Sequence, residues 1–380
     1  MICKRCGNSD PAFFYAGHRG SYCRKCVRFR RILLEEEAEG IDYETDPLAA
    51  DTQFAFPLTP RQSEISHACV KALQEEDVLL LCVTGAGKTE ISVESLSACL
   101  KAGKKAAYAI ARREVVRELA QRFEKIFPYA KVTAVYGGHS GELEGDLIIC
   151  TTHQLYRYHA TFDLLVLDEV DAFPFKGDET LWGIARRAAK GRILYSTATL
   201  DPFTEKMVGQ VRTLRLQERP HRQPIPVPKL CILPKVFQLL YTLCKLYKSK
   251  RRLILFVPSR DLCRILYRFF SLFVSCTLAY SDLPEREANI ASFRDGKGKL
   301  LVATTVLERG VTFKDIDVAV YDWLPGVFDK ASLIQMSGRA GRNFLSPEGE
   351  VTIYTAFPNE EVRSCIREIK EANATLSVLS

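Results

Sequence analysis

The chain alternates short apolar runs with amphipathic stretches of helical length from residue 54 onward. In segment 114–127, Val115, Leu119, Phe123 and Ile126 recur every three or four positions, which predicts a helix that faces a core. This alternation is typical of a parallel sheet covered by helices. The first series of predicted strands covers residues 77–83, 105–111, 131–136, 146–150, 163–167 and 192–196.

The pattern breaks after Glu218, where the sequence RPHRQPIPVPK holds four prolines in eleven residues. Prolines at this density exclude a helix or a central strand, so the segment is predicted to be a hinge. A second series of strands follows at residues 252–257, 274–280, 299–303, 317–321 and 350–355. The predicted domains are a module at 1–31, a linker at 32–54, a first lobe at 55–216, a hinge at 217–229 and a second lobe at 230–380.

Length and composition agree with two cores and a small appendage, because 380 residues exceed one ordinary domain. The chain is 47% hydrophobic and 26% charged. It contains no run of roughly 20 apolar residues, the length that a membrane span requires. The N-terminal sequence MICKRCGNSD lacks the apolar core of a signal peptide, so we expect a cytoplasmic protein.

Thirteen cysteines divide into two groups. Nine are scattered through apolar or helical segments, which predicts core thiols in a reducing compartment. Cys3, Cys6, Cys23 and Cys26 form two C-x-x-C pairs separated by sixteen residues, and this spacing predicts a zinc site. Four thiolates leave no open position on the metal, so the zinc is expected to be structural, with His18 as a less favoured ligand.

Charge is distributed unevenly near the N-terminus. Residues 1–31 contain eight Lys or Arg and one acid, with aromatic residues interleaved. Two interpretations of the rings stay open, since they would either stack on bases or pack around the metal. Residues 32–51 contain eight acids and no Lys or Arg, which predicts a solvated acidic helix followed by a linker. A further hypothesis places the stretch from Glu35 to Asp51 in a basic DNA path when DNA is absent.

A phosphate-binding loop follows the first predicted strand. In the sequence CVTGAGKT, residues Thr84, Gly85, Ala86 and Gly87 form a loop whose backbone N–H groups turn toward an anion at a helix N-terminus. Lys88 is predicted to reach the β and γ phosphates of ATP, and Thr89 to bind magnesium. Cys82 stands where the usual pattern opens with Gly or Ala.

An acidic pair ends the strand near residue 167. Asp168 and Glu169 project from the carboxyl edge of the predicted sheet. We expect Asp168 to hold the magnesium and Glu169 to polarise the attacking water. The sequence therefore predicts an ATP-hydrolysing site.

At this point the chain resembles superfamily 2 helicases. DEVD at 168–171 is similar to their motif II, Ser196–Thr199 to motif III, and QMSGRAGR at 335–342 to motif VI. The resemblance implies two RecA-like lobes with ATP between them. It also implies roles for individual residues: Gln62 reads adenine, Gly310 of motif V belongs to the nucleotide site, and Arg339 and Arg342 stabilise charge on the γ-phosphoryl group.

The same resemblance implies contacts with nucleic acid. The similar segments are 110–113 (motif Ia), 151–155 (motif Ib), 256–259 (motif IV) and 304–310 (motif V). Hydroxyls and amides at strand ends suit phosphate contacts that do not read sequence. The predicted DNA-binding residues are Arg112, Arg113, Thr151, Thr152, Ser259, Thr304 and Thr305.

The four-cysteine module ahead of one compact motor, with VTGAGKTE, TTHQL and DEVDAFP, resembles the ComFA family of late-competence proteins. That resemblance implies an ATPase that moves single-stranded DNA inward across the cytoplasmic membrane. It also implies competence proteins at the uptake channel as partners, and docking at the inner face of the membrane through them. Three alternatives stay open: a PriA-like replication-restart helicase, a DEAD-box RNA helicase, and a scaffold whose nucleotide site only switches conformation.

Overall fold

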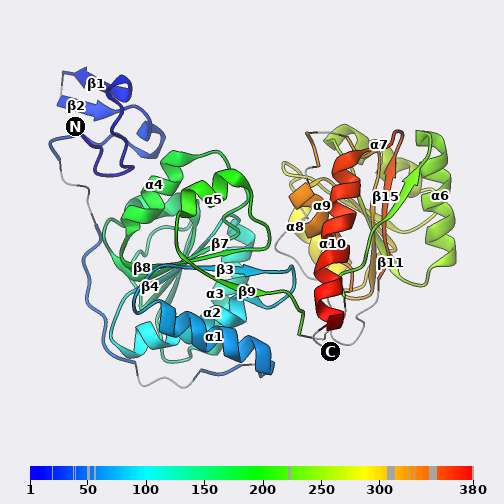
Figure 1. Cartoon of the computed structure of the whole chain (residues 1–380). Coiled ribbons are helices and arrows are strands. Elements are labelled where there is room, and N and C mark those ends of the chain that lie inside the picture. The colour runs from blue at the N-terminus through cyan, green and yellow to red at the C-terminus, as the bar shows by residue number, and fades with distance from the viewer. Residues whose placement is uncertain are drawn as a thin grey trace. The chain divides into compact units, whose positions relative to one another are not determined.

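The computed structural model describes residues 1–18, 20–36, 38, 40–48, 52–54, 57–220, 224–305, 313–324, 326–328, 330–341 and 349–378. The chain divides into two compact units. Unit 1 comprises residues 1–83 and 87–216, and unit 2 comprises residues 84–86 and 217–380. Figure 1 shows that each unit contains a sheet flanked by helices, so the predicted α/β class is confirmed.

Unit 1 holds a seven-stranded parallel sheet with strand order β5-β6-β4-β7-β8-β3-β9. Its strands are β3 (Val78–Cys82), β4 (Ala106–Ile110), β5 (Val132–Val135), β6 (Leu147–Thr151), β7 (Phe162–Asp168), β8 (Ala189–Thr197) and β9 (Arg212–Leu216). Its helices are α1 (Pro60–Ala72), α2 (Lys88–Lys101), α3 (Arg113–Ile126), α4 (Glu179–Ala188) and α5 (Pro202–Val208). In Figure 1, α4 and α5 lie on one side of this sheet and α1, α2 and α3 on the other.

The apolar runs explain why the sheet lies between two helical layers. Every residue of β4 and β6 is buried, as expected for strands covered on both faces. Helix α3 confirms the predicted amphipathic segment and buries Leu119, Phe123 and Ile126. The first member of its stripe differs from the prediction, because Val116 is fully buried and Val115 is only half-buried. The helix starts one residue earlier than expected, and its buried face also includes Ala120.

The N-terminal module is a hairpin of β1 (Phe14–Gly17) and β2 (Gly20–Cys23) between the short 3-10 helices η1 (Pro11–Phe13) and η2 (Val27–Phe29). Within unit 1, it packs beside α4. A Cβ on Gly183 of α4 would lie 1.9 Å from the carbonyl oxygen of Cys6, so the two backbones touch. Lys25 Nζ lies 3.3 Å from a Glu179 carboxylate oxygen, and Arg28 pairs with Asp178.

The prediction of an acidic helix after the N-terminal module is wrong. The described residues between 32 and 48 contain no helix and run along the first lobe. Their polar groups bond to that lobe instead: the Thr45 hydroxyl donates to the carbonyl of Gly103 at 3.0 Å, and the Leu48 N–H donates to the carbonyl of Leu100 at 3.2 Å. Acidic side chains without an apolar stripe cannot anchor a helix on a core, so contacts with the lobe determine the backbone path.

Unit 2 holds a six-stranded parallel sheet with strand order β10-β15-β14-β11-β13-β12. Its strands are β10 (Lys229–Ile232), β11 (Arg252–Phe256), β12 (Cys276–Ala279), β13 (Leu300–Ala303), β14 (Ile316–Val320) and β15 (Val351–Thr355). Its helices are α6 (Lys235–Lys248), α7 (Arg260–Phe270), α8 (Arg286–Arg294), α9 (Lys330–Ser337) and α10 (Glu360–Val378). Residues of α6 and α7 pack with β11, β13 and β14 in one apolar cluster.

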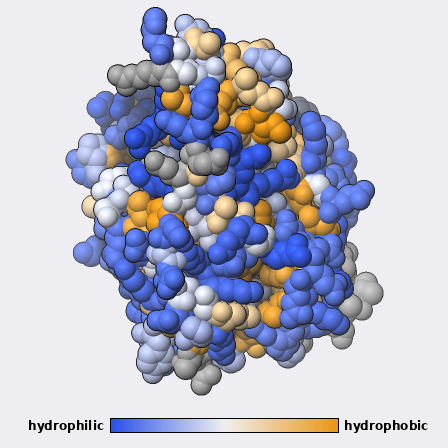
Figure 2. All heavy atoms as spheres, turned by 90° about the vertical axis from the view of Figure 1, so that its left-hand side faces the viewer, coloured by the Kyte–Doolittle hydropathy of each residue, from blue (hydrophilic) through white to orange (hydrophobic). Residues whose placement is uncertain are grey.

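Polar residues dominate the exterior seen from the side of unit 1 in Figure 2, where hydrophobic residues form small separate groups. No helix in the described part of the chain combines the length and the apolar character that crossing a bilayer requires.

Candidate nucleotide site and nucleic-acid contacts

The phosphate loop connects β3 to α2. Gly85 and Gly87 both have φ of +86°, a conformation that residues with a side chain rarely adopt. Gly87 is the N-cap of α2, and no side chain caps this helix end. The first N–H groups of α2 therefore remain available to an anion, which the positive end of the helix dipole also attracts. Lys88 and Thr89 are the first two residues of this helix and are half-buried.

Gln62 lies against the same loop. Its side-chain nitrogen would be 2.4 Å from a Cβ placed on Gly87. Gln62 also completes the capping box of α1, because its Oε1 accepts a hydrogen bond of 2.9 Å from the Thr59 N–H while the Thr59 hydroxyl accepts from the Gln62 N–H at 3.3 Å. The capping box fixes the glutamine next to the phosphate loop. Its role in reading adenine stays a prediction.

The acidic pair lies at the carboxyl end of β7. Asp168 is buried and Glu169 is half-buried. Glu169 has φ of +57°, which is uncommon for a residue with a side chain, and its N–H donates to Asp168 Oδ1 at 3.0 Å. Asp168 is held on its other oxygen by Tyr108 of β4, whose hydroxyl donates to Asp168 Oδ2 at 2.8 Å. The Tyr108 oxygen also lies 3.5 Å from the hydroxyl of Thr89.

These contacts bring the two predicted magnesium ligands to one buried tyrosine. Burial raises the pKa of Asp168, whereas the charge of Lys88 and the hydrogen bond from Tyr108 lower it. Burial and the charge of Asp168 raise the pKa of Tyr108 well above its usual value, so Tyr108 stays a protonated donor. The sequence analysis missed Tyr108 because a tyrosine inside an apolar strand resembles a core residue.

A second hydrogen-bonded link joins the acidic loop to the end of β8. The Thr199 hydroxyl donates to Asp171 Oδ2 at 2.6 Å, and the Thr197 hydroxyl donates to the carbonyl of Thr199 at 2.7 Å. Asp171 is buried. Hydrogen bonds therefore join the motif II and motif III segments, and Asp168 and Ser196 are also partners in the register of β7 and β8.

The predicted arginines belong to unit 2. Arg339 lies in the turn after α9, and its N–H donates to the carbonyl of Met336 at 3.0 Å. Arg219, which the sequence analysis did not select, braces this turn: its guanidinium donates to the carbonyls of Gly338 at 3.2 Å and Gly341 at 3.2 Å. Arg342, Gly310 and the rest of segment 306–310 lie outside the described residues.

The predicted DNA-binding residues differ in accessibility. Thr151 and Thr152 are buried, Arg112 is half-buried, and Arg113 is exposed and pairs with Glu114 at 3.2 Å. Ser259 is exposed and caps α7 by accepting from the Leu262 N–H at 3.2 Å. Thr304 and Thr305 follow β13 and are half-buried. Their contacts with DNA stay predictions.

The four module cysteines converge. Their sulfurs all lie within 4.8 Å of one another, with Cys3 to Cys26 at 3.7 Å and Cys6 to Cys23 at 3.8 Å. A tetrahedral zinc with bonds of about 2.3 Å separates its sulfur ligands by about 3.8 Å, so the donor set and its geometry fit zinc. His18 is exposed and does not belong to the cluster.

Comparison with known proteins agrees with both lobes. A DEAD/DEAH box helicase model matches residues 59–207, and a helicase conserved C-terminal domain model matches residues 235–344. The competence protein ComFA of Bacillus subtilis strain 168 is 31% identical, over 98% of this chain and 85% of that protein. The competence protein ComFA of Streptococcus pneumoniae is 30% identical, over 98% of this chain and 90% of that protein.

Solved structures show the same fold. The structure of S. cerevisiae Dbp5 bound to RNA and ADP BeF3 matches with a TM-score of 0.61 and 19% identity, over 83% of this chain and 92% of that one. The two RecA-like sheets that the motifs predicted are therefore confirmed.

Proposed function

Because the chain belongs to the ComFA family of competence proteins and carries the ATPase domains of a superfamily 2 helicase, we propose that it is an ATP-driven single-stranded DNA translocase. In this function, ATP hydrolysis moves one strand of transforming DNA into the cell during competence. This proposal is supported most by two observations in a chain that ComFA proteins match almost end to end: Gln62 lies against Gly87 of the phosphate loop, and the charge of Lys88 acts on the buried Asp168.

The residues of unit 1 divide the chemistry. Lys88 and the first N–H groups of α2 bind the β and γ phosphates, and Thr89 and Asp168 hold the magnesium. When bound, magnesium neutralises charge on the phosphates. Glu169 lies beside Asp168 and is only half-buried, so it accepts a proton from the attacking water. Gln62 recognises the adenine.

Charge on the transferred phosphoryl group has to be stabilised as it develops. Arg339 and Arg342 supply guanidinium groups for this purpose, together with Gly310 at the nucleotide. The brace from Arg219 to the Gly338 and Gly341 carbonyls supports this assignment, because it holds the backbone that carries Arg339.

The strand is bound through its phosphates. Arg112, Arg113, Thr151, Thr152, Ser259, Thr304 and Thr305 are the proposed contacts. Such contacts position a strand without reading its bases, which suits DNA of any sequence. We further propose that the protein works in the cytoplasm and reaches the uptake channel at the inner face of the membrane through other competence proteins.

Steady-state ATP turnover tests this function. We expect single-stranded DNA to stimulate the wild type well above duplex DNA and RNA, and Lys88→Ala to abolish turnover with every nucleic acid. Stimulation by RNA alone would favour an RNA helicase. Turnover that no nucleic acid stimulates would favour a scaffold with a nucleotide switch, and it would contradict the proposal.

A further inference from the structure

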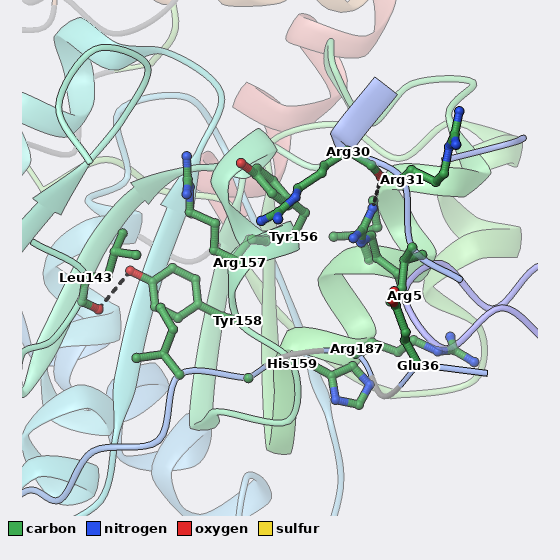
Figure 3. Close-up of a pocket in the computed structure, with 16 residues that line it drawn as sticks. Arg5, Arg30, Arg31, Glu36, Leu143, Tyr156, Arg157, Tyr158, His159 and Arg187 are labelled. Atoms are coloured by element: carbon green, nitrogen blue, oxygen red, sulfur yellow. Dashed lines mark hydrogen bonds between the residues drawn. The ribbon is translucent and has the colours of Figure 1, made fainter. Parts of the chain in front are cut away.

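A cavity of about 720 Å³ lies where the four-cysteine module meets the rest of unit 1. Figure 3 shows its walls, which come from several separate segments and include Leu143. The module supplies Arg5, Arg30 and Arg31, and the segment that includes η3 (Thr152–Arg157) supplies Tyr156 and Arg157. Helix α4 supplies Arg187, and the linker supplies Glu36. The volume is in the range of small-molecule sites.

The lining of this cavity is strongly basic. Five arginines face it, and Glu36 is the only acidic residue among the described residues that line it. No ion pair joins any of these five arginines to an acid within the described part of the chain. Positive charges that outnumber negative ones in a hollow focus a field that attracts anions.

Some of these arginine side chains donate hydrogen bonds within the protein, and others do not. Arg5 donates to the carbonyl of Phe29 at 3.2 Å and also to that of Arg30, and Arg157 donates to Gln154 Oε1 at 2.7 Å. The side chains of Arg30 and Arg187 make no hydrogen bond to any described residue. No hydrogen bond within the described residues occupies their donors, although the Arg187 guanidinium packs against Gly7 of the module.

Arg30 also has an unusual backbone. Its φ of 83° and ψ of 146° lie in a region that almost only glycine occupies. Arg5 stabilises this conformation by bonding to the carbonyls on either side of it. Arginine stands at a position where glycine would be free of strain, which is expected if its guanidinium has a function.

We propose that this cavity binds phosphate groups of a single DNA strand, through the free guanidinium groups of Arg30 and Arg187. This proposal rests on the proposed function and extends its DNA path onto the module. Guanidinium groups match phosphate in geometry and hold two of its oxygens at once. Helix η3 carries Thr152 at its start and Arg157 at its end, so the cavity adjoins the predicted strand contacts.

The test compares two double variants of equal charge. Arg30→Gln with Arg187→Gln removes one arginine of the module and one of the lobe from the cavity. Arg24→Gln with Arg192→Gln does the same at exposed positions outside it. Fluorescence anisotropy measures the binding of labelled oligo-dT to the zinc-loaded full chain over a range of salt concentrations.

We expect the cavity variant to bind the strand about tenfold more weakly than wild type at moderate salt, whereas the control stays within about twofold. The slope of log K against log salt should fall by about 0.7 for each lost phosphate contact, or about 1.4 in total. Equal losses in both variants would overturn the proposal. DNA-stimulated turnover of the wild type is measured in parallel, so a failure of the proposed function is seen separately.

A single variant separates binding from folding. Arg30→Gly removes the guanidinium and relieves the backbone strain, so the melting temperature should hold or rise while strand affinity falls. Binding of free dTMP is measured as a second test. If the wild type binds dTMP and the cavity variant loses dTMP but keeps the strand, the ligand is a free nucleotide and the strand assignment is overturned.

Discussion

Two charged regions of unit 1 differ in how their charge is balanced. At the carboxyl edge of the sheet, the buried Asp168 is held by Tyr108 and faces the positive charge of Lys88. In the cavity beside the module, five arginines gather and none of them pairs with an acid of the described residues. We propose that the first region holds a cation and its nucleotide, and that the second region binds an anion.

The difference teaches how each region depends on the rest of the chain. The acidic edge is built by neighbouring strands of one sheet, whose burial fixes every group. The arginine cavity exists only while the module stays docked on α4 and η3, since three of its arginines come from the module. Changes to the module should therefore affect strand binding, and changes to β4 or β7 should affect nucleotide chemistry.

The largest expected effect is on the module itself. Cys3→Ser with Cys26→Ser removes two of four sulfur ligands, so the purified protein should lose its zinc completely, because a site of this kind holds its domain together with about 10 kcal/mol or more. Plasma emission spectroscopy measures the metal, and limited trypsin digestion measures folding of the basic module. Cys244→Ser, at an exposed cysteine, should keep zinc. A double variant that retains zinc would break the assignment.

At the acidic edge, Tyr108→Phe should lower kcat/KM for magnesium ATP about tenfold, the cost of losing a hydrogen bond to a charged group. That bond lowers the pKa of Asp168, so without it the carboxyl stays protonated to higher pH. The acid limb of the pH profile should move to higher pH. Tyr195→Phe, in the neighbouring strand β8, is the control and should leave the limb in place. An unmoved limb in Tyr108→Phe would show that the tyrosine only fills space.

Asp168→Asn tests the charge balance of the acidic edge through the stability of the protein. Burial raises the pKa of Asp168, so the protonated form stabilises the fold at low pH, and this stabilisation is lost as pH rises through the raised pKa. At neutral pH the buried, ionised Asp168 carboxylate lowers the free energy of unfolding. Replacing it should therefore stabilise the nucleotide-free protein by about 1 kcal/mol. Calorimetry should find a higher melting temperature at pH 8 and a smaller difference at pH 5. A lower melting temperature at pH 8 would contradict this charge balance.

The smallest effect concerns the single acid of the cavity. Glu36→Gln removes a negative charge from the arginine cavity and should tighten strand binding about twofold. Glu205→Gln, on α5, is a control of equal charge and should change affinity less. Anisotropy at low salt measures both. If both variants tighten strand binding equally, the effect comes from the net charge of the protein and not from the cavity. The hypothesis that the acidic stretch occupies the DNA path predicts that neutralising Glu35, Glu36, Glu37 and Glu39 together raises turnover without DNA.

Much of the fold follows from the sequence because long buried strands carry a dense apolar signal. All eleven predicted strands are present, within two residues at most ends and three at the start of β8. The two missed parallel strands, β9 and β10, are at sheet edges, where exposed Arg and Lys side chains obscure the pattern. The acidic stretch was misjudged because its path depends on contacts with the lobe and not on its own residues.

The residues of the candidate site also differ in how readily the sequence reveals them. Lys88, Asp168 and the four cysteines stand in short contiguous patterns whose spacing reflects the chemistry, so they can be selected from the sequence. Tyr108 and Arg219 act on residues 60 or more positions away, and only the folded sheet brings them together. The arginine cavity draws on several separate segments, so no local pattern indicates it.

The most direct test of the account is movement along a strand. A biotinylated single-stranded oligonucleotide carries streptavidin at one end, and its release is followed with ATP and excess free biotin. Wild type should displace streptavidin in an ATP-dependent manner. Glu169→Gln should bind the same strand and ATP without releasing streptavidin. ATP hydrolysis by the wild type with no displacement from either end of the strand would contradict a translocating motor.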